Sequence, residues 1–184
     1  MPDALEVHGP FTQVAKLLRF LDTSVAVGGS WSGDAFSYSH QPLKATTNVK
    51  SASEHVTVPS GRFERCLLME YETRESDLPD EASERQKKLN REFLCGTRWA
   101  WYAPGVGLVQ LEVRSAAGTE ALIQLKEYSV NDGGSDYLPL AVGNSWTYGW
   151  ADVPEEYVAK EHYRVIANEG DTWHLEHYHY LYKE

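Results

Sequence analysis

The stretch Arg62-Phe63-Glu64-Arg65-Cys66-Leu67-Leu68-Met69-Glu70-Tyr71-Glu72 decides the fold class. Large apolar side chains recur here at every second position, namely Phe63, Leu67, Met69 and Tyr71. This period is typical of a β-strand with one face against the core, because successive side chains point to opposite faces of a sheet. The alternation predicts a strand over residues 62–72 with this set facing inward.

Strand signals continue on the C-terminal side of this stretch. Runs rich in aromatic and β-branched residues lie at 93–102, 107–113, 121–128, 159–167 and 172–183. Turn residues such as Pro104-Gly105 and Ala117-Gly118 separate the first three runs, and the polar loop 168–171 separates the last two. We therefore expect a mainly β (α+β) fold, a curved antiparallel sheet or half-barrel meander that ends in a long hairpin.

Two segments depart from the strand pattern. Residues 11–21 carry apolar side chains at helical spacing, which predicts a short N-terminal amphipathic helix that packs on the protein's own sheet. Residues 76–91 are charged and have few apolar anchors, so they form either a solvated helix or a mobile excursion. We expect them to be an insertion between two strands.

Composition limits the classes of partner. The 184 residues carry a formal net charge of −10, which opposes binding to nucleic acid because phosphate contacts need clustered Lys or Arg. No apolar run reaches membrane-spanning length, and Met1 is not followed by a signal-type segment. The chain is expected in the cytoplasm if Met1 is the native start, and in the cell envelope or outside the cell if a signal has been removed. Cys66 and Cys95 are expected to be free, partly buried thiols.

A repeated motif divides the chain. Two stretches of the chain are similar in sequence, namely Ala26-Val27-Gly28-Gly29-Ser30-Trp31-Ser32 and Ala141-Val142-Gly143-Asn144-Ser145-Trp146-Thr147. We interpret each copy as a turn that delivers its Trp onto a strand beginning immediately afterwards. The glycine-rich linker 131–136 then separates a module at 1–130 from a partial second module, or a sheet-completing hairpin, at 136–184.

Three segments resemble uncharacterised bacterial β-rich domains. They are residues 137–148, with Gly143-Asn144-Ser145-Trp146, residues 58–67, with Pro59-Ser60-Gly61-Arg62-Phe63, and Tyr102-Ala103-Pro104-Gly105-Val106-Gly107-Leu108-Val109. These domains are similar to the half-barrels of LolA/LolB-like lipoprotein carriers. The resemblance implies a curved antiparallel sheet with a helix over its concave side. Relatives of this kind carry an export signal, which this sequence does not display.

His162, His177 and His179 are the candidate metal ligands. Centring the C-terminal hairpin on Glu169-Gly170 places His162 opposite His177, with His179 two residues along on the same face. Imidazoles in this arrangement can hold a divalent ion. The alternative is that these histidines are flat amphipathic members of an aromatic ladder.

The function expected is that of a non-enzymatic binding or interaction module. Its aromatic face, supplied partly by Trp99, Trp101 and Tyr102, would hold an apolar small molecule or a peptide from a protein partner. The alternatives are a purely structural module of a larger bacterial protein and, third, a metal-binding protein. No cofactor motif is found, and residues 28–33 miss the Gly-x-Ser-x-Gly register of a nucleophile elbow. We therefore expect no enzyme and no cofactor.

Overall fold

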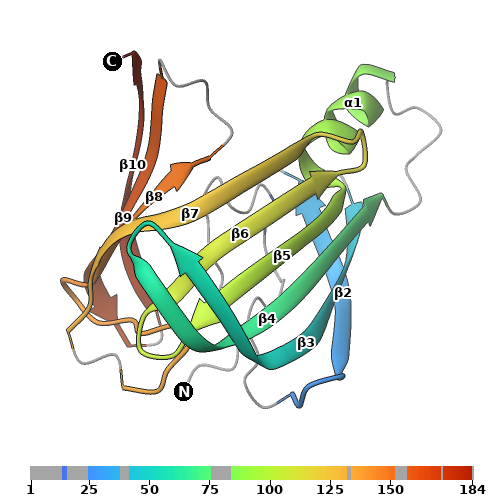
Figure 1. Ribbon diagram of the computed structural model, residues 1–184. Coiled ribbons are helices and arrows are strands. Elements are labelled where there is room, and N and C mark those ends of the chain that lie inside the picture. Colours follow the sequence, from blue (N-terminus) through green and yellow to red (C-terminus); the bar gives the residue numbers. More distant parts are fainter. Residues whose placement is uncertain are drawn as a thin grey trace. The chain divides into compact units, whose positions relative to one another are not determined.

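A computed structural model describes residues 14–15, 25–37, 42–75, 84–131, 134–151, 157–170 and 172–183 (Figure 1). The elements in chain order are β1 (Val14–Ala15), β2 (Ser30–Ser37), β3 (Pro42–Val58), β4 (Gly61–Glu75), α1 (Glu84–Leu89), the π-helical turn η1 (Asn90–Leu94), β5 (Gly96–Ala103), β6 (Gly107–Ser115), β7 (Glu120–Ser129), β8 (Ser145–Trp150), β9 (Tyr157–Glu169) and β10 (Thr172–Lys183).

The strands form a meander. Each strand lies beside its neighbours in the sequence, from β1 at one end of the order to β10 at the other. The pairs β1–β2, β2–β3, β7–β8, β8–β9 and β9–β10 are antiparallel. The mainly β class and the expected C-terminal hairpin are confirmed, while the half-barrel curvature stays a prediction.

The chain divides into two compact units that interleave along the sequence. The first unit comprises residues 1–50, 69–99 and 113–120, and the second comprises 51–68, 100–112 and 121–184. The linker 131–136 lies within the second unit, where the backbone N–H of Asn131 donates to Oδ1 of Asn144 at 2.9 Å. The module boundary expected there stays a prediction.

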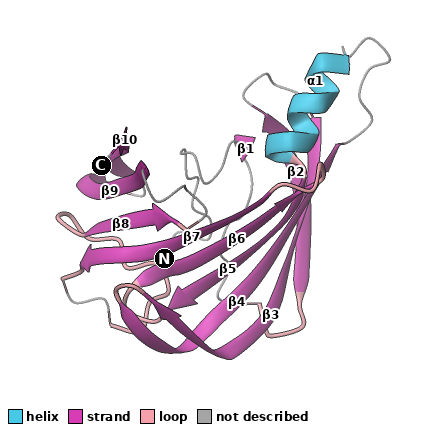
Figure 2. Ribbon diagram, turned by 45° about the horizontal axis from the view of Figure 1, so that its top comes forward, coloured by secondary structure: helices cyan, strands magenta, loops and turns pink. Residues whose placement is uncertain are grey.

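The first unit contains the connection between β4 and β5. Within the expected insertion, residues 84–89 form α1 (Figure 2). The turn η1 follows and brings Leu94 and Cys95 into a buried cluster with Leu43 and Ala45 of β3. Of the two readings left open by the sequence, a helix is therefore correct for residues 84–89.

The second unit is built around large aromatic side chains whose polar atoms are satisfied by backbone. Nε1 of Trp146 donates to the carbonyl of Val106 at 2.6 Å, and the hydroxyl of Tyr148 donates to that of Leu108 at 3.0 Å. Both aromatic rings are buried. A buried Trp or Tyr needs a partner of this kind, so these bonds fix the position of β8 against β6.

The two copies of the repeated motif adopt the same turn. In the first copy, Gly28 donates to and Gly29 accepts from the backbone of Val49 on β3. In the second copy, Gly143 and Asn144 bond Val165 on β9 in the same way, with distances of 2.8 and 2.9 Å. Gly28 and Gly143 have φ of 87° and 96°, a region that favours glycine. A strand begins directly after each turn, at Ser30 and at Ser145, as predicted.

The strand that the alternation predicted is part of β4. Leu67, Met69 and Tyr71 are buried as expected, but Cys66, on the opposite parity, is buried too and Phe63 is only partly so. The reason is Arg65, whose φ of 57° interrupts the regular pleat and shifts the residues before it relative to those after it. Alternation alone does not report such an irregularity.

The helix expected at residues 11–21 falls almost wholly outside the described residues. Its two described members, Val14 and Ala15, form β1 and pair with Ser37 and Phe36 of β2. Over the described ranges, no helix has the length and apolar character needed to cross a membrane.

Candidate functional site

The three aromatic residues proposed as a ligand face do not share one face of β5. Tyr102 and its neighbour Ala100 point to the buried side, whereas Trp99 and Trp101 lie on the other parity and are partly exposed. The prediction that all three line one surface is wrong, because residues 101 and 102 are adjacent on a strand. Whether any of them contacts a ligand stays a prediction.

Trp99 is held by its neighbours within the first unit. Its Nε1 donates to Oε2 of Glu70 at 3.0 Å, and the guanidinium of Arg114 lies 5.9 Å from the ring centroid. Oε1 of Glu70 also receives hydrogen bonds from Asn48 at 3.2 Å and Lys50 at 3.4 Å. Glu70 is therefore the centre of a polar network that holds the indole on the partly exposed face.

The register of the C-terminal hairpin differs from the expected one. Thr172 pairs with Glu169, two residues away from the expected register, and an irregularity between His174 and Leu175 shifts the pairing back by one residue. His162 consequently lies opposite Tyr178 and not opposite His177. Since a one-residue slip moves a side chain to the other face, the expected His162–His177 pair is wrong. His162 instead shares a 3.0 Å hydrogen bond with Thr147.

His177 and His179 share the other face of the hairpin with a buried acid, Glu161, which is 1% exposed. Nε2 of His177 donates to Oε2 of Glu161, and Nδ1 of His179 donates to Oε1 at 2.8 Å. His177 also stacks on Tyr163, with ring centroids 4.6 Å apart. Each carboxylate oxygen therefore has an imidazole partner, and this arrangement offsets the cost of burying the charge.

This cluster is not arranged as a metal centre. Both ring nitrogens are directed at the carboxylate itself, so no open point is shared by the three side chains. Across the described part of the chain, no group of three or more His, Cys, Asp or Glu side chains is placed to hold a metal ion. The carboxylate of Glu161 therefore orients the two imidazoles.

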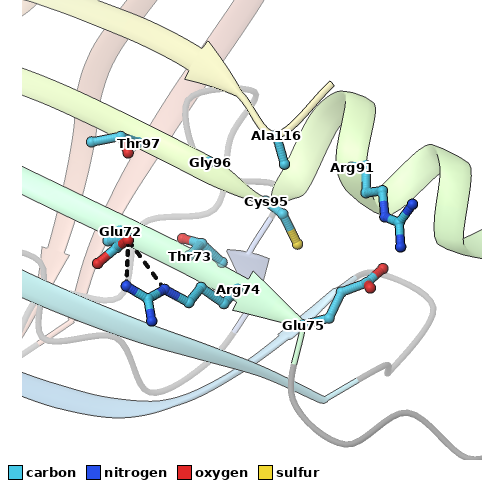
Figure 3. A pocket seen from close by; sticks show the side chains of 9 residues that line it. All are labelled: Glu72, Thr73, Arg74, Glu75, Arg91, Cys95, Gly96, Thr97 and Ala116. Carbon is cyan, nitrogen blue, oxygen red and sulfur yellow. Dashed lines mark hydrogen bonds and ion pairs between the residues drawn. The ribbon is translucent and has the colours of Figure 1, made fainter. Parts of the chain in front are cut away.

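A pocket with charged and apolar walls lies in the first unit, where the end of β4 meets η1 and the start of β5 (Figure 3). It is open to solvent and has a volume of about 280 Å³. Its walls are supplied by Glu72, Thr73, Arg74, Glu75, Arg91, Cys95, Gly96, Thr97 and Ala116. Four of these nine residues are charged, so a polar or charged group has partners in the pocket.

The charges in the pocket are of two kinds. Glu72 and Arg74 neutralise one another, because Nη2 and Nε of the arginine lie 2.6 and 3.1 Å from Oε1 of the glutamate. Glu75 differs, since its Oε1 is buried and has no hydrogen-bond partner among the described residues. Its side chain points to the same side of the pocket as those of Cys95 and Arg91 (Figure 3).

Cys95 contributes a neutral thiol to this pocket. Burial, together with the charge of Glu75, raises the pKa of Cys95 above its ordinary value. The thiol therefore stays protonated at neutral pH and is a poor nucleophile. Burial likewise raises the pKa of Cys66 to about 11. Both cysteines are free, as predicted, and both are buried where the sequence led us to expect partial burial.

Sequence reasoning missed both the pocket and the acid of the histidine cluster. Glu72 to Glu75 lie at the end of β4, whereas Arg91 and Cys95 follow α1 in the sequence. No sequence motif connects the two groups of pocket residues. Glu161 carried a usable signal, because it occupies the parity of Tyr163 and Val165 in β9. An acid on an otherwise apolar face calls for a partner.

Comparison of the chain with protein-family models, with curated proteins and with solved structures found no match. The resemblance to lipoprotein carriers therefore stays a prediction, and the assignment of function rests on the geometry.

Proposed function

We propose that this protein is a non-enzymatic binding module whose pocket beside η1 accepts a cationic group, such as the ammonium of a lysine side chain in a peptide. The observation that carries the proposal is the buried Oε1 of Glu75, which has no hydrogen-bond partner among the described residues. A buried acceptor left without a donor costs roughly 1–3 kcal/mol and more when it is charged. A ligand N–H would recover that cost.

The size and chemistry of the pocket support this class of ligand. Its volume of about 280 Å³ suits one side chain or a very small molecule. Thr73 and Thr97 supply further hydrogen-bonding groups on its wall, and Arg91 lies at the same wall with an exposed side chain. An ammonium at Glu75 together with a peptide carbonyl at Arg91 would satisfy both charges. Of the two ligand classes expected from the sequence, this favours a peptide over an apolar molecule.

The test compares two probes that share a four-carbon side chain and differ only by the terminal ammonium group. Nα-acetyl-lysine amide and Nα-acetyl-norleucine amide are titrated into the full chain, with amide chemical shifts of residues 91–97 and calorimetry as readouts. The lysine probe should bind, and the norleucine probe should not. Glu75→Gln should weaken binding by about tenfold to a hundredfold, the value of a charge-assisted hydrogen bond.

Glu64→Gln is the matched control. Glu64 is an exposed glutamate of β4 that pairs with Arg62 at 3.4 Å, outside the pocket. Glu64→Gln should leave the affinity for the lysine probe unchanged. Equal binding of the two probes, or equal affinity of Glu75→Gln and the wild type, would overturn the proposal in favour of a structural module.

A further inference from the structure

β10 is the last strand in the order of the sheet (Figure 1). It is twelve residues long, and one of its edges pairs with β9. No strand among the described residues pairs with the other edge. Natural proteins protect such edges with prolines, bulges, inward charges or short strands, because unpaired backbone groups recruit other chains. From Leu175 to Lys183, β10 pairs with β9 in unbroken register and contains no proline.

The internal repeat relates β10 to a strand whose two edges are both paired. The turns at residues 26–29 and 141–144 lead into β2–β3 and β8–β9 respectively, with equivalent backbone bonds to Val49 and Val165. β10 therefore corresponds to β4, the strand that follows β3. The far edge of β4 is occupied by β5.

The sequence of β10 is nearly symmetric about Tyr178. Reading outward in both directions from this residue gives His177 and His179, and then, beyond one residue on each side, Leu175 and Leu181. In an antiparallel pair of identical strands related by a twofold axis normal to the sheet, each residue lies opposite one of equal parity. The axis through Tyr178 places His opposite His and Leu opposite Leu.

Further pairs in this register bring polar groups of opposite kind together. Glu176 lies opposite Tyr180 of the second copy, whose hydroxyl can donate to the carboxylate. Trp173 lies opposite Lys183 in this register. With neutral histidines, β10 carries one acid and one base, so the strand has no net charge in a chain whose charge is −10. Self-association along β10 thus avoids the repulsion that most of the surface would cause.

From these observations we propose that two copies of this chain pair antiparallel along β10, centred on Tyr178. The pairing continues the sheet and covers the exposed rings of Tyr178 and Tyr180, which are 43% and 47% exposed in the single chain. It also brings His177 of each copy opposite His179 of the other, beside the two buried Glu161 carboxylates.

Cysteine cross-linking tests both the pairing and its register. In Tyr178→Cys the two thiols meet across the axis and should form a disulfide-linked dimer under mild oxidation. In Tyr180→Cys they are four residues apart along the strand, roughly 13 Å, and should not. The native Cys66 and Cys95 are buried and are present in both variants, so they do not cause a difference in cross-linking between the two. Equal cross-linking of the two variants, or none in either, would overturn the proposed register.

Substitution by lysine tests the dimer without any cross-link. Tyr178→Lys sets two like charges directly opposite one another and should weaken the dimer by at least about tenfold in analytical ultracentrifugation. Tyr180→Lys should preserve it, because the new lysine faces Glu176. Circular dichroism verifies that both variants fold. The experiment uses a protein concentration of about 100 μM. A wild-type chain that sediments as a monomer at this concentration would contradict the proposal. A greater loss of dimer in Tyr180→Lys than in Tyr178→Lys would contradict it as well.

Discussion

Two carboxylates, one in each unit, have buried oxygens whose surroundings differ in kind. Glu161 in the second unit has an imidazole on each oxygen. Glu75 in the first unit has a buried oxygen without a partner in the described part of the chain, and it lines a pocket. The protein itself satisfies the first charge, so that acid belongs to the fold. The second charge lacks such a partner, and this difference is why we assign ligand binding to the first unit.

The largest effect should follow the loss of a partner of Glu161. His177→Leu keeps a side chain against Tyr163 but leaves Oε2 of the buried carboxylate without its donor. We expect the free energy of unfolding to fall by about 3 kcal/mol, as for other broken buried pairs. Urea denaturation at pH 7 measures this value. A loss below 0.5 kcal/mol, the scale of ordinary surface substitutions, would show that Glu161 does not depend on this imidazole.

Replacing the acid should cost less than removing its partner. Glu161→Leu eliminates the buried charge, and the half-exposed rings of His177 and His179 can turn to water. We expect the free energy of unfolding to stay within about 1 kcal/mol of the wild type, because a well-packed apolar residue often replaces a buried ion without loss. The same urea experiment ranks the two variants, and a larger loss in Glu161→Leu than in His177→Leu would reverse our reading of this cluster.

Cys66 gives a pH-dependent comparison, since it is an ionisable group that the fold keeps neutral. Burial raises the pKa of its thiol from 9.0 to about 11. Above pH 9 the unfolded chain binds fewer protons at this site than the folded chain, so stability present below pH 9 is lost as the pH rises toward 11. The difference in unfolding free energy between the wild type and Cys66→Ala should shrink between pH 7.5 and 10.5. A constant difference would contradict the raised pKa.

The smallest effect should come from an exposed counterpart of the Glu161 cluster. His174 lies 3.5 Å from Glu169, and both side chains are exposed. His174→Leu should change the free energy of unfolding by less than about 0.5 kcal/mol, because solvent screens such a pair. This variant is the control for His177→Leu on the same strand. A loss as large as that of His177→Leu would mean that any histidine of β10 matters equally.

The sequence was sufficient for β4 to β7, for the C-terminal hairpin and for the repeated turns, because alternation and paired glycines are local signals. It gave no range for β3. The meander followed from short turns such as Pro104-Gly105, which join neighbouring strands. The register of the C-terminal hairpin could not be predicted from the sequence. An irregularity after His174 leaves no mark in a pattern of alternating residues, and yet it decides which face His162 occupies. The pocket was also beyond its reach, because Glu75 and Arg91 meet only through the folded connection between β4 and β5.

The most direct test of the contrast between the two acids is their isosteric replacement, measured side by side by urea denaturation at pH 7 without ligand. Glu161→Gln weakens two charge-assisted hydrogen bonds and should lower the free energy of unfolding by about 2 kcal/mol. Glu75→Gln removes a charge that lacks a donor and should leave the stability unchanged or raise it by about 1 kcal/mol. A Glu75→Gln variant that loses as much stability as Glu161→Gln would contradict the account, because Glu75 would then be held by the fold and not kept for a ligand.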